Sequence, residues 1–177
     1  MSRKVGSVIA TIITAVSVHY VYAFNNRVQL VQDFTSLPEA HLNRVTFIKA
    51  KGSTALFDAT YAAVEKVREG RHHKKVILIF SDGEENSSRY SGRELRNLLR
   101  ENDVQIYAIG MSEISSGAGT LKFISEPTGG QALFPFDYAS AEVVYTRLAL
   151  MLRRQYVISS ADGDCWLVAG RGNRHCA

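Results

Sequence analysis

Two oxygen-bearing side chains stand out by where they fall along the chain. Thr54 follows Gly52-Ser53 at the start of a predicted helix, and Asp82 follows an uninterrupted apolar run, residues 76–80. A hydroxyl and a carboxylate are hard oxygen ligands, which suit Mg²⁺, Mn²⁺ or Ca²⁺. Taken singly, each has a favoured structural role, Thr54 as a helix N-cap and Asp82 in an Asx turn. A metal site is a better hypothesis than these two separate roles only if the fold brings Thr54 and Asp82 close together.

The elements around these residues predict that the two loops meet. Leu56, Ala59, Thr60, Ala63, Val64 and Val67 recur at the spacing of an amphipathic helix that ends at Gly70. The run at 76–80 is apolar at every position, which indicates a parallel strand covered on both faces. In sheets of such strands, ligands bind beyond the carboxyl ends of the strands. Both loops are expected at that edge.

The rest of the chain continues to alternate strand and helix. Strands are predicted at residues 19–24, 27–34, 104–109, 131–136 and 156–158, and helices at 37–48, after the Ser91/Glu94 capping box, at 121–125 and at 141–154. This alternation predicts an α/β fold with a mostly parallel sheet and right-handed crossovers.

In order and with their flanks, these segments resemble a von Willebrand factor type A domain of the subgroup common in bacterial secreted proteins. The resemblance covers Tyr20–Ser160, and its most specific part is GSTALFDA followed by an apolar strand and SDGEENSS. It implies a doubly wound α/β fold with a metal-ion-dependent adhesion site, where an acidic side chain of a protein ligand completes the coordination. Thr54 matches the metal-ligating threonine of the family, and Asp82 matches its aspartate.

The chain departs from the family at its N-terminus. The family's Asp-x-Ser-x-Ser motif is missing, and no aspartate precedes Asp33. The resemblance therefore implies an incomplete metal site of Thr54 and Asp82, with weak or absent binding of Mg²⁺, Mn²⁺ or Ca²⁺. It also implies a sheet without its first strand, a place that residues 5–18 would fill as a helix or a non-native strand. We expect an apolar, helical segment at 1–18, the domain proper at 19–160 and an irregular tail at 161–177.

Compartment is left open by the sequence. Residues 5–24 carry no charged side chain and follow Arg3 and Lys4, so they fit an export signal or membrane anchor as well as two buried globular elements. The two cysteines, Cys165 and Cys176, are too few for a disulfide framework, but one bridge between them is compatible with an exported chain.

The remaining signals argue against other functions. A net charge of +4 among 177 residues is mild, and the basic cluster at 68–75 indicates a solvated turn rather than a nucleic-acid site. Glu84 and Glu85 are expected in an exposed loop without a partner histidine, and no catalytic constellation is found. We therefore expect a protein-binding or adhesion module and not an enzyme. The alternatives are an inert or partner-dependent truncated fragment and, as the weakest, a metal-dependent phosphoesterase using Asp82.

Overall fold

The chain falls into two compact units in its computed structural model, Met1–Pro135 and Phe136–Ala177. The structure describes residues 7–13, 18–24, 27–35, 53–70, 75–110, 113–153, 157–159, 165–168 and 174–176. The helix predicted at 37–48 lies outside the described residues. Each unit is described by itself below.

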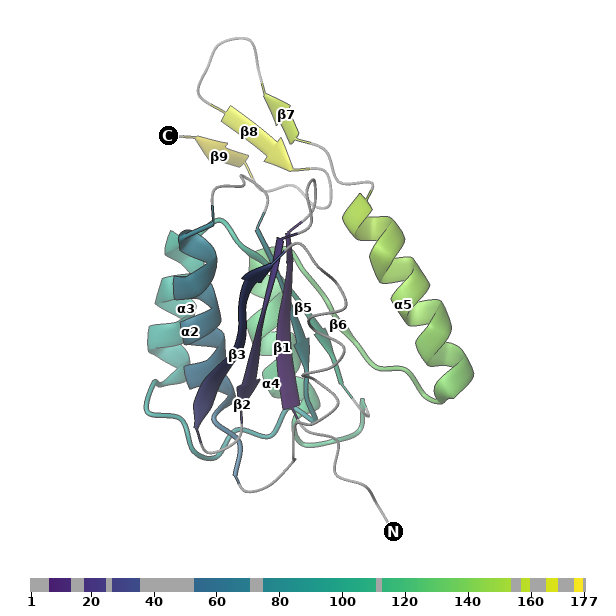
Figure 1. The fold of residues 1–177 in the computed structure, drawn as a ribbon. Helices are drawn as coiled ribbons and strands as arrows, with labels where there is room; N and C mark the ends of the chain where they lie inside the picture. The colour runs from purple at the N-terminus through teal and green to yellow at the C-terminus, as the bar shows by residue number, and fades with distance from the viewer. Residues whose placement is uncertain are drawn as a thin grey trace. The chain divides into compact units, whose positions relative to one another are not determined.

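The first unit is built on a six-stranded sheet (Figure 1). Its strands are β1 (Ser7–Ile13), β2 (Val18–Phe24), β3 (Val28–Thr35), β4 (Val76–Phe80), β5 (Gln105–Ile109) and β6 (Ala132–Leu133), in the spatial order β3-β2-β1-β4-β5-β6. β4, β5 and β6 are parallel, while β1 is antiparallel to both of its neighbours. β2 therefore runs in the same direction as β4, and four of the six strands share one direction. This is the strand order of a doubly wound α/β sheet, as predicted.

The first strand distinguishes between two expectations. Residues 5–18 were expected to fill the place of the missing first strand as a helix or as a non-native strand. Residues 7–13 form a strand, β1, in the centre of the sheet, where Val8 is the register partner of both Ala23 and Phe80. The helical segment expected at 1–18 is therefore wrong at residues 7–13. β1 satisfies backbone groups of β2 and β4 that an empty position would leave unpaired. Only residues 14–17 separate it from β2, which is enough for a hairpin but not for a parallel crossover. The position expected to lack a strand is thus filled by one of reversed direction.

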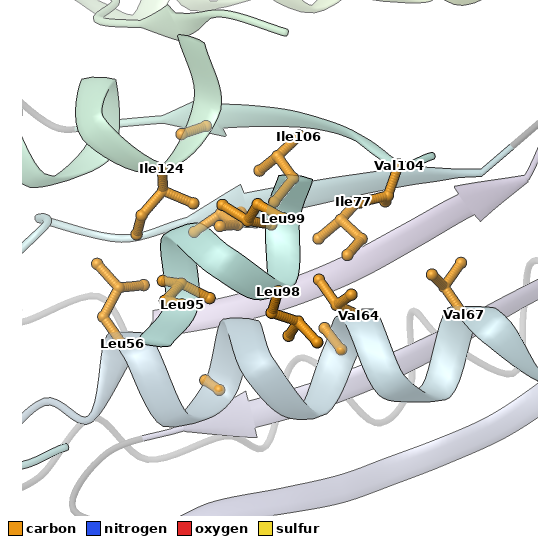
Figure 2. Close-up of a cluster of buried hydrophobic side chains, with 14 of the residues drawn as sticks. Leu56, Val64, Val67, Ile77, Leu95, Leu98, Leu99, Val104, Ile106 and Ile124 are labelled. Atoms are coloured by element: carbon orange, nitrogen blue, oxygen red, sulfur yellow. The ribbon is translucent and has the colours of Figure 1, made fainter. Parts of the chain in front are cut away.

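Three helices cover one face of this sheet. They are α2 (Leu56–Arg68), α3 (Gly92–Glu101) and α4 (Ala118–Ser125), the last followed by the 3₁₀ turn η1 (Glu126–Thr128). Their apolar side chains form one buried cluster with Ile77 of β4 and Ile106 of β5 (Figure 2). The buried Tyr20 hydroxyl of β2 donates a hydrogen bond to the Ala63 carbonyl oxygen of α2 at 2.5 Å. These contacts hold α2 against the sheet.

The second unit combines a helix with a small sheet. α5 (Tyr138–Arg153) overlaps the helix predicted at 141–154, and β7 (Val157–Ser159) overlaps the strand predicted at 156–158, with residues 154–156 outside the described part of the chain. β8 (Cys165–Val168) and β9 (Arg174–Cys176) extend this into an antiparallel sheet of order β7-β8-β9. The prediction of an irregular tail at 161–177 is therefore wrong at these strands, which are too short to show an alternating pattern. Among the described residues, no helix has the length and apolarity needed to cross a membrane.

Candidate functional site

The loop after β4 and the start of α2 are joined by backbone and amide hydrogen bonds. The Thr54 N–H donates to Oδ1 of Asn86 at 2.8 Å, and the Asn86 N–H donates back to the Thr54 carbonyl oxygen at 3.0 Å. Asn86 is four residues beyond Asp82, so one short loop carries both Asp82 and the partner of Thr54. The prediction that the two loops meet at this edge is confirmed.

Glu85 caps α2 from this loop. Its Oε2 accepts from the Phe57 N–H at 2.7 Å and from the Ser88 hydroxyl at 2.7 Å, and its Oε1 accepts from the Ser88 N–H at 3.0 Å. The Ser88 hydroxyl oxygen in turn accepts from the Asp58 N–H at 3.1 Å. A carboxylate at a helix N-terminus is favoured by the helix dipole and by the unpaired N–H groups there. The expectation that Glu85 is an exposed loop carboxylate is wrong, because the side chain is half-buried in this clamp.

Asp58 makes the reciprocal contact from α2 to the loop. Its Oδ1 accepts from the backbone N–H groups of Arg89 at 2.9 Å and Tyr90 at 3.0 Å. Its Oδ2 accepts from Nε of Arg89 at 3.2 Å, an ion pair in which the Arg89 side chain is 86% exposed and that of Asp58 only 10%. The Tyr90 ring also stacks on Tyr61 of α2, with centroids 3.9 Å apart. The second half of the loop, residues 85–90, is therefore held to the start of α2.

Of the structural roles expected for the two predicted ligands, the structure shows that of Asp82 but not that of Thr54. Asp82 is exposed, and its Oδ1 accepts from the Glu84 N–H at 3.2 Å, which is the Asx turn expected of it. Thr54 is buried but is not the N-cap of α2, because Ala55 holds that position and Glu85 supplies the capping oxygen. The role of the Thr54 hydroxyl as a metal ligand stays a prediction, as does that of the Asp82 carboxylate.

A third loop abuts the same edge of the sheet. Gly83 has a left-handed φ of 80°, and a Cβ there would lie 2.2 Å from the Gly117 carbonyl oxygen. A Cβ at Gly117 would lie 2.2 Å from the Asp82 carbonyl oxygen. The two glycines let the loop after β5 approach the Asp82 loop backbone to backbone. On that third loop, the Ile114 side chain is 98% exposed.

Thr54 and Asp82 are the kind of oxygen ligand that a hard cation prefers, but they are too few to fill its coordination shell. Thr54 and Asp82 offer two protein oxygens, whereas Mg²⁺ and Ca²⁺ take six or more oxygen ligands. Within the part of the chain that the structure describes, no three His, Cys, Asp or Glu side chains gather as a metal-binding group. The His72-His73 pair falls outside that part.

Sequence reasoning identified Thr54 and Asp82 but missed the residues that bind their loops together. Those residues are Asp58, Glu85, Asn86 and Ser88. The available signal was the density of oxygen-bearing side chains in residues 84–88, which follow a buried strand and have no helix of their own to cap. Their partners lie about thirty positions away in the sequence, which no local pattern reveals.

A six-stranded sheet of order β3-β2-β1-β4-β5-β6, with loops gathered beyond the carboxyl ends of β4 and β5, places the chain in the class of doubly wound α/β folds. More specifically, it belongs to the von Willebrand factor type A domain family, whose sequence model matches residues 14–147. A search of curated protein sequences finds no match.

Solved structures show the same fold at low sequence identity. The conserved hypothetical protein BatB from Bacteroides thetaiotaomicron is similar over 75% of this chain and 78% of its own, with a TM-score of 0.58 and 14% identity. A von Willebrand factor type A protein from Catenulispora acidiphila is similar over 89% of this chain and 48% of its own, with a TM-score of 0.62 and 12% identity. The SpRpn10 VWA domain is similar over 70% of this chain and 67% of its own, with a TM-score of 0.51 and 16% identity.

Proposed function

We propose that this chain is a protein-binding module whose ligand docks on the rim loops, defined as residues 53–55, 81–90 and 113–117. Thr54 and Asp82 lie in this rim as the remaining oxygen ligands of an incomplete cation site. On this proposal, the rim binds a protein mainly through its own side chains, and a divalent cation adds little. The module binds and does not catalyse.

The hydrogen bonds that tie the loops together are the observation that supports this proposal. A flexible rim would lose conformational entropy on binding, whereas loops already held by Glu85 and Asp58 lose less. The rim also presents side chains of mixed chemistry, with the carboxylate of Asp82 and the apolar Ile114 both exposed. Preorganised loops with exposed polar and apolar groups are the usual basis of protein recognition on a rigid scaffold.

The cation part of the proposal is tested by thermal unfolding with and without Mg²⁺. With a Kd of about 10 mM, about 5 mM Mg²⁺ stabilises the fold by only about 0.2 kcal/mol, less than about 1 °C in Tm. A complete site with a Kd of about 0.1 mM would give about 2.3 kcal/mol and several degrees. We expect the small shift. A large shift that Asp82→Asn abolishes and the exposed control Glu84→Ala keeps would refute the incomplete site.

The binding part is tested by comparing partners captured from a cell extract by matched variants. Ile114→Asp places a charge on the exposed rim, and Asn97→Asp places the same charge on the exposed face of α3. We expect at least one protein to bind the wild-type chain and the Asn97→Asp variant but not the Ile114→Asp variant. If the Ile114→Asp variant captures every protein that the Asn97→Asp variant captures, the rim is not the docking surface.

A further inference from the structure

The small sheet of the second unit places the two cysteines of the chain opposite each other. The sequence contains only Cys165 and Cys176, and in the β8–β9 pairing they are direct register partners. The next partners inward are Trp166 with His175 and Leu167 with Arg174. We propose that Cys165 and Cys176 form a disulfide bond under oxidising conditions and that this bond closes the β8–β9 hairpin.

Backbone geometry supports this pairing. Facing residues of antiparallel strands have Cα atoms about 4.5 or about 5.5 Å apart, depending on their place in the hydrogen-bond ladder. Disulfides span Cα separations of about 4.4–6.8 Å, so both spacings fall within the range that the bond can bridge. Register partners also lie on the same face of the sheet, whereas a shift by one residue places a side chain on the opposite face. Position 176 therefore fits Cys165, and position 175 does not.

The hairpin also gains from such a bond. β8 has four residues and β9 three, so β9 is held at the edge of the β7-β8-β9 sheet by few backbone pairings, and such short pairings are marginal in water. A covalent link at the open end of the hairpin removes unfolded conformations of the enclosed loop and so favours the paired state.

The chemistry requires an external disulfide as oxidant, such as oxidised glutathione. One cysteine thiolate attacks the glutathione disulfide and forms a mixed disulfide, releasing one reduced glutathione. The second thiolate attacks the protein sulfur of that mixed disulfide and releases the second reduced glutathione. The two thiol protons pass through solvent to the two released glutathione thiolates, the two cysteines are oxidised by two electrons, and the glutathione disulfide is reduced by the same two.

The test is a thiol–disulfide equilibrium of the full chain in glutathione buffers, quenched by alkylation and read by mass spectrometry. Trypsin cleaves after Arg154, Arg171 and Arg174, so the oxidised protein yields residues 155–171 linked to residues 175–177. The control combines Cys176→Ala with His175→Cys, which keeps two thiols at almost the same separation in sequence but one position out of register.

We expect the wild-type pair to close at least about tenfold more favourably than the control in native buffer, because only the wild-type positions face each other. In concentrated guanidinium chloride, the two pairs should close equally within about twofold, because only loop length then matters. Equal closure in native buffer would overturn the proposal. Cross-linked dimers in place of the intramolecular link would also overturn it.

Discussion

Replacing Glu85 with alanine tests whether the loop after β4 is held by the clamp on α2. The substitution removes the carboxylate oxygens that accept hydrogen bonds from the Phe57 N–H, the Ser88 N–H and the Ser88 hydroxyl. It leaves the Phe57 N–H in the first turn of a helix whose own N-cap, Ala55, provides no side-chain acceptor. In the Glu85→Ala variant, no side chain at the N-cap position of α2 can therefore replace Glu85 as the acceptor for the Phe57 N–H.

The size of the effect follows from two contributions. Loss of a side-chain cap costs about 1 kcal/mol, and loss of a negative charge at a helix N-terminus costs up to about 1 kcal/mol more in a partly buried setting. We expect Glu85→Ala to lower the free energy of unfolding by about 2 kcal/mol, or the Tm by about 6 °C. Glu85→Gln keeps an acceptor oxygen but no charge, so about half of that loss is expected.

Urea unfolding of the three variants Glu85→Ala, Glu85→Gln and Glu84→Ala measures these differences directly. Glu84 is the matched control, because it is exposed in the same loop and substitutions of such residues stay within about 0.5 kcal/mol. The expected order of stability is Glu84→Ala above Glu85→Gln above Glu85→Ala. If Glu85→Ala and Glu84→Ala unfold at the same urea concentration, the clamp does not stabilise the fold and the reasoning fails.

Two further predictions follow from local geometry. Gly117→Ala should destabilise the fold by about 2–3 kcal/mol in urea unfolding, because its Cβ would lie 2.2 Å from the Asp82 carbonyl oxygen, whereas Gly119→Ala has open space and should be neutral or stabilising. Hydrogen bonds from the Ser91 N–H and hydroxyl lower the pKa of Glu94 below its ordinary value of 4.5. The contribution of Glu94 to stability is therefore fully present above pH 4.5 and disappears as pH falls through the lowered pKa. Thermal unfolding of Glu94→Gln should therefore show a deficit against wild type at neutral pH that vanishes in acid; a deficit that persists there would contradict the assignment.

Local sequence patterns were enough to predict a helix whose cap and buried face are both encoded in neighbouring residues. The Ser91/Glu94 capping box and the buried stripe of Leu95, Leu98 and Leu99 are both present in α3. The same reasoning left helix and strand open for residues 7–13, because an uncharged apolar run fits a buried helix or a buried strand equally well. The choice of strand depends on the open sides of β2 and β4, one of which lies about 70 residues away in sequence.

The candidate site shows the same division. Thr54 precedes a predicted helix and Asp82 follows a predicted strand. These places predicted that the two loops meet, because loops of both kinds gather at the carboxyl edge of a parallel sheet. The hydrogen bonds from Phe57 to Glu85 and from Arg89 and Tyr90 to Asp58 could not be predicted. Each of these hydrogen bonds joins a backbone N–H to a side chain far away in the sequence. Because every residue except proline has a backbone N–H, the residue type does not show which N–H will be used.

The contact between Gly83 and Gly117 limits how this rim can diversify. Neither position can gain a side chain while the other stays in place, since each added Cβ would overlap backbone of the facing loop. Single mutations at either site are therefore expected to destabilise the fold, which disfavours them in evolution and in laboratory selection alike. A library for new binding specificities should keep both glycines and randomise the exposed neighbours, Glu84, Glu113, Ile114 and Ser116.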